Sequence, residues 1–262
     1  MIGDSFVEAS MLDPRDRPAA QLERALASSR PVYAMGAPGT ALLDYAERIR
    51  FAHEKWGVRD FVILMERFDV RQSFCGSGNI SGPCVERGTL APSEQLQAPP
   101  GPLKRVLRHS ALAQYVFRQI KLDPARLWSQ IVNQARPETG PKPPATTGQP
   151  AAVSDETLRA LAFVTDTFFK RIEPYRTGKL VVVLDSDRSR IYRGDDTADA
   201  ARRQFIEKAR AAGALVIDTE PLFREQMTRS ELKLDVGPYD THLNPLGLRI
   251  AMTAAARALM AQ

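Results

Sequence analysis

Two kinds of hydrophobic pattern alternate along this chain. Uninterrupted apolar runs predict strands buried on both faces. Stretches whose apolar positions recur every three or four residues predict amphipathic helices. The predicted strands cover residues 31–36, 60–66, 180–187 and 214–219, and the predicted helices cover residues 19–29, 40–56, 155–175, 198–212 and 245–261.

Strands and helices that alternate in this way indicate a parallel sheet with helices on both faces. We therefore expect an α/β protein, a three-layer α/β/α sandwich around a flavodoxin-like parallel sheet. In such a sheet the functional site lies at the carboxyl ends of the strands. The length of 262 residues suits one large domain of this class.

The stretch from about residue 71 to residue 154 breaks this alternation. It holds a loop between two cysteines, an amphipathic piece at 106–120, and the low-complexity tract RPETGPKPPATTGQP. Such a tract cannot bury enough apolar surface to order itself. We interpret 1–262 as a single domain with an insertion at about 71–154, and we expect a flexible Pro-rich loop at 136–154.

The charge balance raises the question of nucleic acid, because 36 Lys and Arg stand against 31 Asp and Glu, a net charge of +5. The basic residues are scattered among acids, as on solvated helix faces, and no basic run or aromatic platform stands out. We therefore expect no nucleic-acid partner. No run of about 18 apolar residues predicts a membrane span, and the chain as given is expected to be soluble. The oligomeric state is left open.

The two cysteines, Cys75 and Cys84, flank the short loop CGSGNISGPC. A close pair of this kind forms a small disulfide in an oxidising compartment, whereas two free thiols are usual in the cytosol. We favour the disulfide. The segment offers too few ligands for a metal site, and we expect neither a metal nor a cofactor.

The chain contains residues suited to nucleophilic catalysis by serine, which needs a base in hydrogen-bond reach and an acid that orients the base. Of the three histidines, His53 and His109 lie in helical stretches without an acid in a suitable turn. His242 lies in GPYDTHLNPLG, two residues after Asp240. An Asp at this spacing can bind Nδ1 and leave Nε2 facing a substrate. A capping Asp beside a surface His is the alternative.

Ser5 has the complementary features. It follows Gly3, which can adopt a tight turn, and Asp4, and it precedes a helix start. Free N–H groups and the helix dipole at that place would stabilise an oxyanion, although a Ser there can also be a simple N-cap. Only two residues precede Gly3, too few for a strand. The first ten residues also lack the pattern of a signal peptide. We therefore expect the natural polypeptide to start upstream, where most of the first strand and an export signal would lie.

Three segments, GDSFVEA at 3–9, GAPGTALLDYA at 36–46 and DTHLNPLG at 240–247, resemble in this order the first, second and fifth blocks of the SGNH (GDSL-type) hydrolases. The resemblance implies Ser5 as nucleophile, His242 as base and Asp240 as its acid. It also implies an oxyanion hole made by the backbone N–H groups of Ser5 and Gly39, with Gly36 as the less favoured register.

The function that this resemblance implies is a serine esterase or O-acyltransferase acting on acetyl-like groups. The family's acid usually lies three residues before the His, where this chain has Tyr239. The D-x-H spacing resembles branches that acylate or deacylate bacterial polysaccharides. A small-molecule or glycan ester is therefore the expected substrate, and the periplasm or cell envelope is the expected location.

The third block departs from the family, which expects G-x-N-D with the Asn donating to the oxyanion. Here the strand ends in Glu66-Arg67-Phe68-Asp69, so Phe68 stands where the Asn is expected. Loss of one such donor typically costs about 10²–10³ in rate. Arg67, Asn79 and Asn244 are candidate substitutes. The departure also supports an alternative function, a non-catalytic SGNH-like module that binds glycan or forms a scaffold.

The run LVVVLDSDRSR also resembles the opening of haloacid-dehalogenase phosphatases, in which Asp185 would be the nucleophile beside Mg²⁺, with Asp187 two residues on. The later pieces of that family do not follow, which makes this the weaker alternative. In an SGNH fold the same run is the fourth strand. Its end would then contribute to the substrate cleft. The expected cleft residues are Asp4, Arg67, Asp69, Asp185, Asp187 and Arg188.

Overall fold

The computed structural model describes residues 1–77, 81–96, 153–238 and 240–261. These residues belong to one compact unit, which comprises Met1–Gln97 and Val153–Gln262. The amphipathic piece predicted at 106–120 and most of the Pro-rich loop predicted at 136–154 lie outside the described residues. The interpretation as a single domain with an insertion at about 71–154 therefore stays a prediction.

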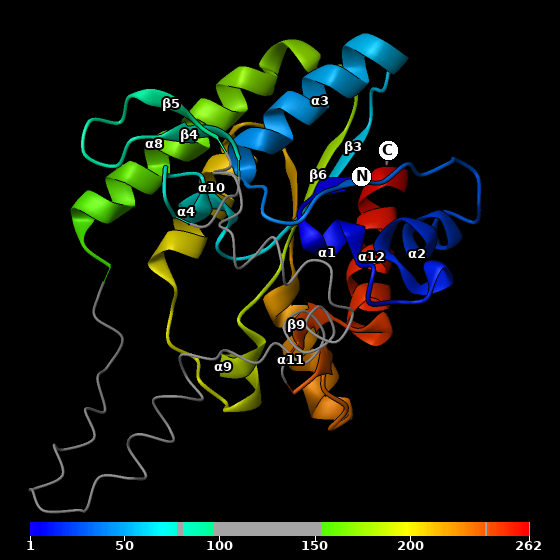
Figure 1. The fold of residues 1–262 in the computed structure, drawn as a ribbon. Coiled ribbons are helices and arrows are strands. Elements are labelled where there is room, and N and C mark those ends of the chain that lie inside the picture. Colours follow the sequence, from blue (N-terminus) through cyan, green and yellow to red (C-terminus); the bar gives the residue numbers. More distant parts are fainter. Residues whose placement is uncertain (78–80, 97–152, 239, 262) are drawn as a thin grey trace, which may run out of the picture. The chain divides into compact units, whose positions relative to one another are not determined.

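A five-stranded parallel sheet forms the centre of this unit (Figure 1). In spatial order its strands are β2 (Met35–Gly36), β1 (Ile2–Gly3), β3 (Phe61–Met65), β6 (Leu180–Leu184) and β7 (Leu215–Asp218). Every neighbouring pair is parallel. Counted along the chain, the order is 2-1-3-4-5, which is the flavodoxin-like arrangement. The predicted fold class is confirmed.

The two faces of the sheet bury separate hydrophobic cores, because successive residues of a strand point to opposite sides. On β3, Phe61, Ile63 and Met65 face one core, whereas Val62 and Leu64 face the other. All five side chains are buried. The strand therefore has no polar position, and this explains the uninterrupted apolar run in the sequence.

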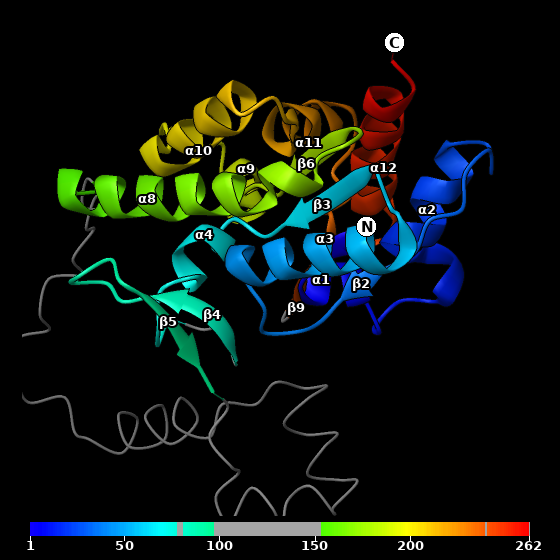
Figure 2. The ribbon, with the colours of Figure 1, turned by 90° about the horizontal axis from the view of Figure 1, so that it is seen from above.

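Helices close both cores and complete the predicted three layers. The first core is covered by α3 (Leu42–Trp56), α8 (Asp155–Ile172) and α10 (Ala200–Ala211), and Figure 2 shows α8 between the other two. The second core is covered mainly by α2 (Pro18–Ala25) and α12 (Pro245–Met260), which lie side by side although they come from opposite ends of the chain (Figures 1 and 2).

Two antiparallel hairpins lie outside the central sheet, β4 with β5 and β8 with β9. Among the described residues, no helix is long and apolar enough to cross a membrane. The remaining elements are α1 (Ser5–Glu8), α4 (Asp69–Gln72), β4 (Gly82–Val85), β5 (Pro92–Gln95), α9 (Arg188–Tyr192), α11 (Thr219–Arg229), β8 (Asp235–Gly237), β9 (Asp240–Leu243) and 3₁₀ turns at Pro14–Asp16 and Glu173–Tyr175.

All four predicted strands are shorter in the structure than in the sequence pattern, and two of them lose three residues or more. Of residues 31–36 only β2 is a strand. Pro31 has no N–H to donate to a ladder, and the Val32 N–H donates to Glu23 Oε2 at 3.0 Å instead. The run 180–187 leaves the sheet after Leu184. Its last residue, Asp187, caps α9 by accepting a hydrogen bond from the backbone N–H of Arg190.

Cys75 and Cys84 form a disulfide, with their Cα atoms 5.1 Å apart. The bond joins the segment after α4 to β4. The Cys75 N–H also donates to the carbonyl oxygen of Val85 at 3.0 Å, and both Cys84 and Val85 are buried. The base of the β4–β5 hairpin is therefore held to the core by a covalent bond and a backbone hydrogen bond.

Candidate active site

The residues considered for catalysis and for the substrate cleft lie near the carboxyl edge of the sheet. Ser5 follows β1, the segment 66–69 follows β3, and the segment 185–188 follows β6. Parallel strands bring all three segments to the same edge. The hairpin β8–β9, which carries the D-x-H motif, approaches this edge with the side chain of His242 directed at Ser5.

Ser5, His242 and Asp240 form one continuous hydrogen-bonded line. His242 Nε2 lies 2.8 Å from Ser5 Oγ, and His242 Nδ1 lies 2.5 Å from Asp240 Oδ1. The same Asp240 oxygen accepts the backbone N–H of His242 at 3.0 Å, so the turn itself orients the acid. The ring of Phe6 lies against the imidazole with centroids 4.7 Å apart. His53, by contrast, lies in α3 with Nδ1 3.0 Å from the carbonyl oxygen of Val58.

Asp4 fixes the start of the helix that carries Ser5. Its Oδ1 accepts the backbone N–H of Phe6 at 2.8 Å, and its Oδ2 lies 3.4 Å from Ser5 Oγ. Burial raises the pKa of Asp4, and the bond from Phe6 opposes that shift. Asp4 therefore serves as the N-cap of α1, and Ser5 is free of the capping role considered for it.

Two glycines let the backbone pack closely behind Ser5. A Cβ atom on Gly3 would come 2.5 Å from the carbonyl oxygen of Leu64. The need for glycine is therefore crowding within the sheet, and the tight turn expected at Gly3 is not observed, since the residue lies in β1. A Cβ atom on Gly36 would come 2.3 Å from the backbone nitrogen of Glu8. Gly36 thus supports α1 from the side.

Gly39 lies in the turn between β2 and α3, in the left-handed conformation with φ of 74°. A glycine adopts this conformation without steric cost. Neither the Ser5 N–H nor the Gly39 N–H has a hydrogen-bond acceptor among the described residues. Both groups are therefore available for a ligand.

The segment that replaces the expected G-x-N-D block presents a cation beside an aromatic ring. Phe68 is 42% exposed, and the Arg67 guanidinium lies 4.4 Å from the centre of its ring. Arg67 also forms an ion pair with Asp187. Arg67 and Asp187 both line a cavity of about 510 Å³. Among the candidate substitute donors in the described part of the chain, Arg67 therefore lies in the wall of this cavity.

The other two candidates for the substitute donor are asparagines. Asn79 lies outside the described residues. Asn244 donates from Nδ2 to the carbonyl oxygens of Lys233 and Asp235, at 2.8 and 3.2 Å, while its Oδ1 caps α12. Asn244 therefore does not serve as the substitute donor, because its side chain holds β8 to the start of α12.

Asp69 does not line the cleft, contrary to expectation. The side chain is fully buried, and its Oδ2 accepts Tyr45 Oη at 2.8 Å and the Glu66 N–H at 2.9 Å. Its Oδ1 has no hydrogen-bond partner in the described part of the chain. Burial and the carboxyls of Asp4 and Glu66 raise the pKa of Asp69 well above its usual range. Asp69 is thus a structural residue turned into the core.

The 510 Å³ cavity is lined mostly by residues with polar or charged side chains, and Ser5, Asp240 and His242 are not among them. Thr241 and Phe6, the chain neighbours of His242 and Ser5, line it, and so do four of the six predicted cleft residues. Asp4 is not among its lining residues. The four predicted residues in the wall are Arg67, Asp185, Asp187 and Arg188.

Glu66, Tyr192 and Asp235 also line this cavity and were not foreseen. Burial raises the pKa of Glu66 to about 7, with Asp185 and Asp4 acting in the same direction. Only its place at the end of a strand could have indicated it. Tyr192 Oη accepts the backbone N–H of Leu234 at 2.8 Å, a contact that no spacing in the sequence reveals.

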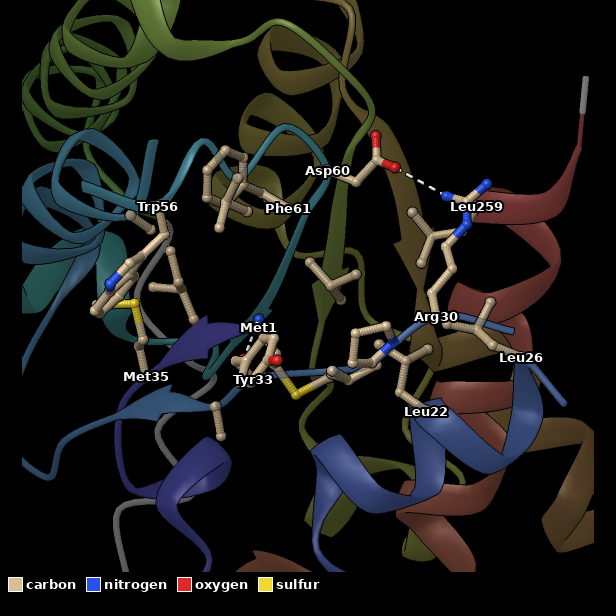
Figure 3. Close-up of a pocket in the computed structure, with 17 residues that line it drawn as sticks. Met1, Leu22, Leu26, Arg30, Tyr33, Met35, Trp56, Asp60, Phe61 and Leu259 are labelled. Atoms are coloured by element: carbon tan, nitrogen blue, oxygen red, sulfur yellow. Dashed lines mark hydrogen bonds and ion pairs between the residues drawn. The ribbon is translucent and has the colours of Figure 1, made fainter. Parts of the chain in front are cut away.

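A second cavity, of about 670 Å³, lies at the amino ends of the strands (Figure 3). Its lining is mainly apolar and includes Leu22, Trp56 and Phe61, with an ion pair between Arg30 and Asp60 at 2.8 Å. None of the residues singled out for chemistry lines it. The residues singled out for chemistry lie instead at the carboxyl edge of the sheet.

No family model and no curated protein sequence matches this chain. Similar solved structures include a member of the lipolytic protein G-D-S-L family from Veillonella parvula DSM 2008, 14% identical with a TM-score of 0.45, with 99% of this chain and 95% of that chain covered. Another is LAE5, an alpha/beta hydrolase enzyme from the metagenome of Lake Arreo, Spain, 15% identical with a TM-score of 0.46, with 99% and 94% covered. Because both TM-scores are below 0.5, we draw the function from the geometry of the site and from the sequence.

Proposed function

We propose that this chain is a serine esterase or O-acyltransferase of the SGNH type, with Ser5 as its nucleophile. One observation carries the proposal: the hydrogen-bonded line from Ser5 Oγ through His242 to Asp240. A serine becomes nucleophilic when a base takes its proton, and the base works best when an acid fixes its tautomer. The distances from His242 to Ser5 Oγ, 2.8 Å, and to Asp240 Oδ1, 2.5 Å, are consistent with both requirements.

The proposed reaction proceeds through an acyl-enzyme. His242 Nε2 takes the hydroxyl proton while Ser5 Oγ attacks the ester carbonyl carbon, and Asp240 stabilises the imidazolium that forms. The free N–H groups of Ser5 and Gly39 hold the oxyanion. The ester C–O bond then breaks, and His242 gives its proton to the departing alcohol. Water completes hydrolysis, or a sugar hydroxyl completes transfer.

We infer that the alcohol part of the ester is a carbohydrate or a similar hydroxyl-rich compound. Most residues that line the 510 Å³ cavity carry polar or charged side chains, among them Asp187, Ser189 and Lys233. These side chains offer hydrogen-bond donors and acceptors to hydroxyl groups. The Cys75–Cys84 disulfide supports the periplasm or cell envelope as the place of action, because disulfides persist where conditions are oxidising.

The two alternatives are less well supported. A phosphatase of the haloacid-dehalogenase type would need free carboxylates at Asp185 and Asp187, but Arg188 binds the first and Arg67 binds the second. A non-catalytic module would have no need of a serine aligned with a His–Asp pair. The observation that favours a non-catalytic module is Phe68, which stands where the Asn that donates to the oxyanion is expected.

The test is covalent labelling with a fluorophosphonate probe, located by mass spectrometry on protein shown to be folded by circular dichroism. We expect an adduct on Ser5 that is lost in Ser5→Ala and His242→Ala. Asp240→Asn should slow labelling by about 10⁴, since an amide favours the wrong imidazole tautomer. Ser10→Ala, at an exposed serine on the same segment, is the matched control. Unlabelled, folded wild-type protein would refute the proposal and favour the binding module.

A further inference from the structure

The acid and the base of the proposed site lie on a hairpin that is not part of the central sheet. Among the described residues, β8 and β9 pair with each other and with no strand of that sheet. The backbone ladder therefore does not fix where His242 lies relative to Ser5. Side chains from neighbouring elements contribute to this placement, and Arg188 at the start of α9 contacts both strands of the hairpin.

Arg188 binds three acceptors with three different nitrogen atoms. Its Nη1 pairs with the carboxylate of Asp185, at the end of β6, and its Nε donates to Asp235 Oδ1 at 2.7 Å, at the start of β8. Its Nη2 donates to the carbonyl oxygen of Thr241, the residue between the acid and the base. One planar guanidinium thus ties both strands of the hairpin to the central sheet.

The ion pair between Arg188 and Asp185 at the centre of this arrangement is buried. The side chains of Arg188 and Asp185 are 5% and 2% exposed. Burial alone would lower the pKa of Arg188, but the carboxylates of Asp185 and Asp235 raise it above its usual value. An isolated charge at this depth would be costly, so the partners are mutually required. The same guanidinium lies 6.0 Å from the centre of the Phe6 ring, which packs on His242.

We propose that Arg188 is a positioning residue that holds Thr241, and with it the adjoining Asp240 and His242, in line with Ser5. This inference rests on the proposed function of the same site. Arg188 acts through the hairpin, because each of its three nitrogen atoms donates to Asp185, Asp235 or Thr241.

The variant that tests this is Arg188→Lys, because an ammonium group keeps the charge but lacks the planar fork. We expect labelling of Ser5 by the fluorophosphonate probe to slow by about 10²-fold, the usual cost of misplacing a reacting group by about 1 Å. The matched control is Arg190→Lys on the same helix. Arg190 pairs with Asp195 at 3.1 Å and contacts no part of the hairpin among the described residues.

A second readout separates alignment from general loss of structure. The proton that His242 Nδ1 shares with Asp240 should give a far-downfield proton resonance in wild-type protein, assigned by its loss in His242→Ala. We expect Arg188→Lys to shift or broaden this resonance, and Arg190→Lys to leave it unchanged. If Arg188→Lys does not fold, the pair is removed together in Asp185→Leu/Arg188→Met, since apolar replacement of a buried pair is often tolerated. The same slow labelling is then expected.

The outcomes distinguish this proposal from the one on which it rests. Wild-type labelling at Ser5 with an equal rate and an equal resonance in Arg188→Lys, or in the double variant, would overturn the positioning role and leave the serine mechanism standing. Wild-type protein that resists labelling would overturn the serine mechanism, and the resonance would then decide alone whether Arg188 aligns the hairpin.

Discussion

Gly36 lies so close to Glu8 that a Cβ atom on the glycine would come 2.3 Å from the Glu8 nitrogen and 2.8 Å from the carbonyl carbon of Val7. Both atoms belong to the backbone, which cannot swing aside as a flexible side chain does. Strand β2 therefore abuts α1 directly. The position of Ser5, at the first turn of α1, depends on the absence of a side chain at residue 36.

Gly36→Ala should consequently displace α1. We expect Ser5 to react with the fluorophosphonate probe at least about 10²-fold more slowly, since a shift of about 1 Å is enough for such a loss. We also expect the protein to lose about 1–3 kcal/mol of stability from overpacking, measured by urea unfolding. Gly88→Ala is the control, because a Cβ there would meet nothing within 4 Å. Equal labelling of both variants would show that α1 is not set by this contact.

The disulfide between Cys75 and Cys84 closes a short loop, with a sequence separation of 9. A loop of this size is expected to stabilise the folded state by roughly 3 kcal/mol through the lost entropy of the unfolded chain. Cys75→Ser/Cys84→Ser should therefore lower the free energy of unfolding by about that amount in urea titrations. The disulfide joins the segment after α4 to β4 and takes no part in the Ser5–His242 line, so the labelling rate of Ser5 should stay within a factor of about two, as expected for independent sites. A loss of labelling in folded protein would assign the hairpin to the site.

The sequence alone allowed the parallel sheet and the Ser5–His242–Asp240 set to be predicted, for different reasons. Strands such as β3 and β6 are buried on both faces, and their apolar runs are visible without any knowledge of partners. The three residues lie in short motifs whose order along the chain is itself informative. Both signals are local, and local signals survive in a single sequence.

The parts that were missed depend on contacts between distant residues. Arg188 was expected in the cleft, but no spacing in the sequence indicates its contacts with Asp235 and Thr241, which lie 47 and 53 residues further along the chain. Asp69 was misjudged for a related reason. Its place after a strand suggested the cleft, but its carboxyl turns inward to Tyr45. A position at the carboxyl end of a strand predicts where the backbone of a residue lies, but not where its side chain points.

The burial of Glu66 predicts that the stability of the protein depends on pH. Burial raises its pKa from 4.5 to about 7, so between these values the folded protein binds more protons than the unfolded chain. By linkage, stability then falls as pH rises through this window. The full effect corresponds to roughly 3 kcal/mol, and it is present once the pH exceeds about 7.

Glu66→Gln removes this titration and keeps an oxygen that can accept the Phe68 N–H, now bound to Glu66 Oε2 at 2.6 Å. We expect the variant and the wild type to unfold at similar urea concentrations at pH 5. At pH 8 the variant should be more stable, by up to about 3 kcal/mol. Glu54→Gln, at a half-exposed position on α3, should track the wild type at both pH values. A constant difference between Glu66→Gln and wild type across this range would mean that Glu66 is ionised in the folded protein throughout, and that its burial is compensated by a partner such as Arg67, 3.6 Å away.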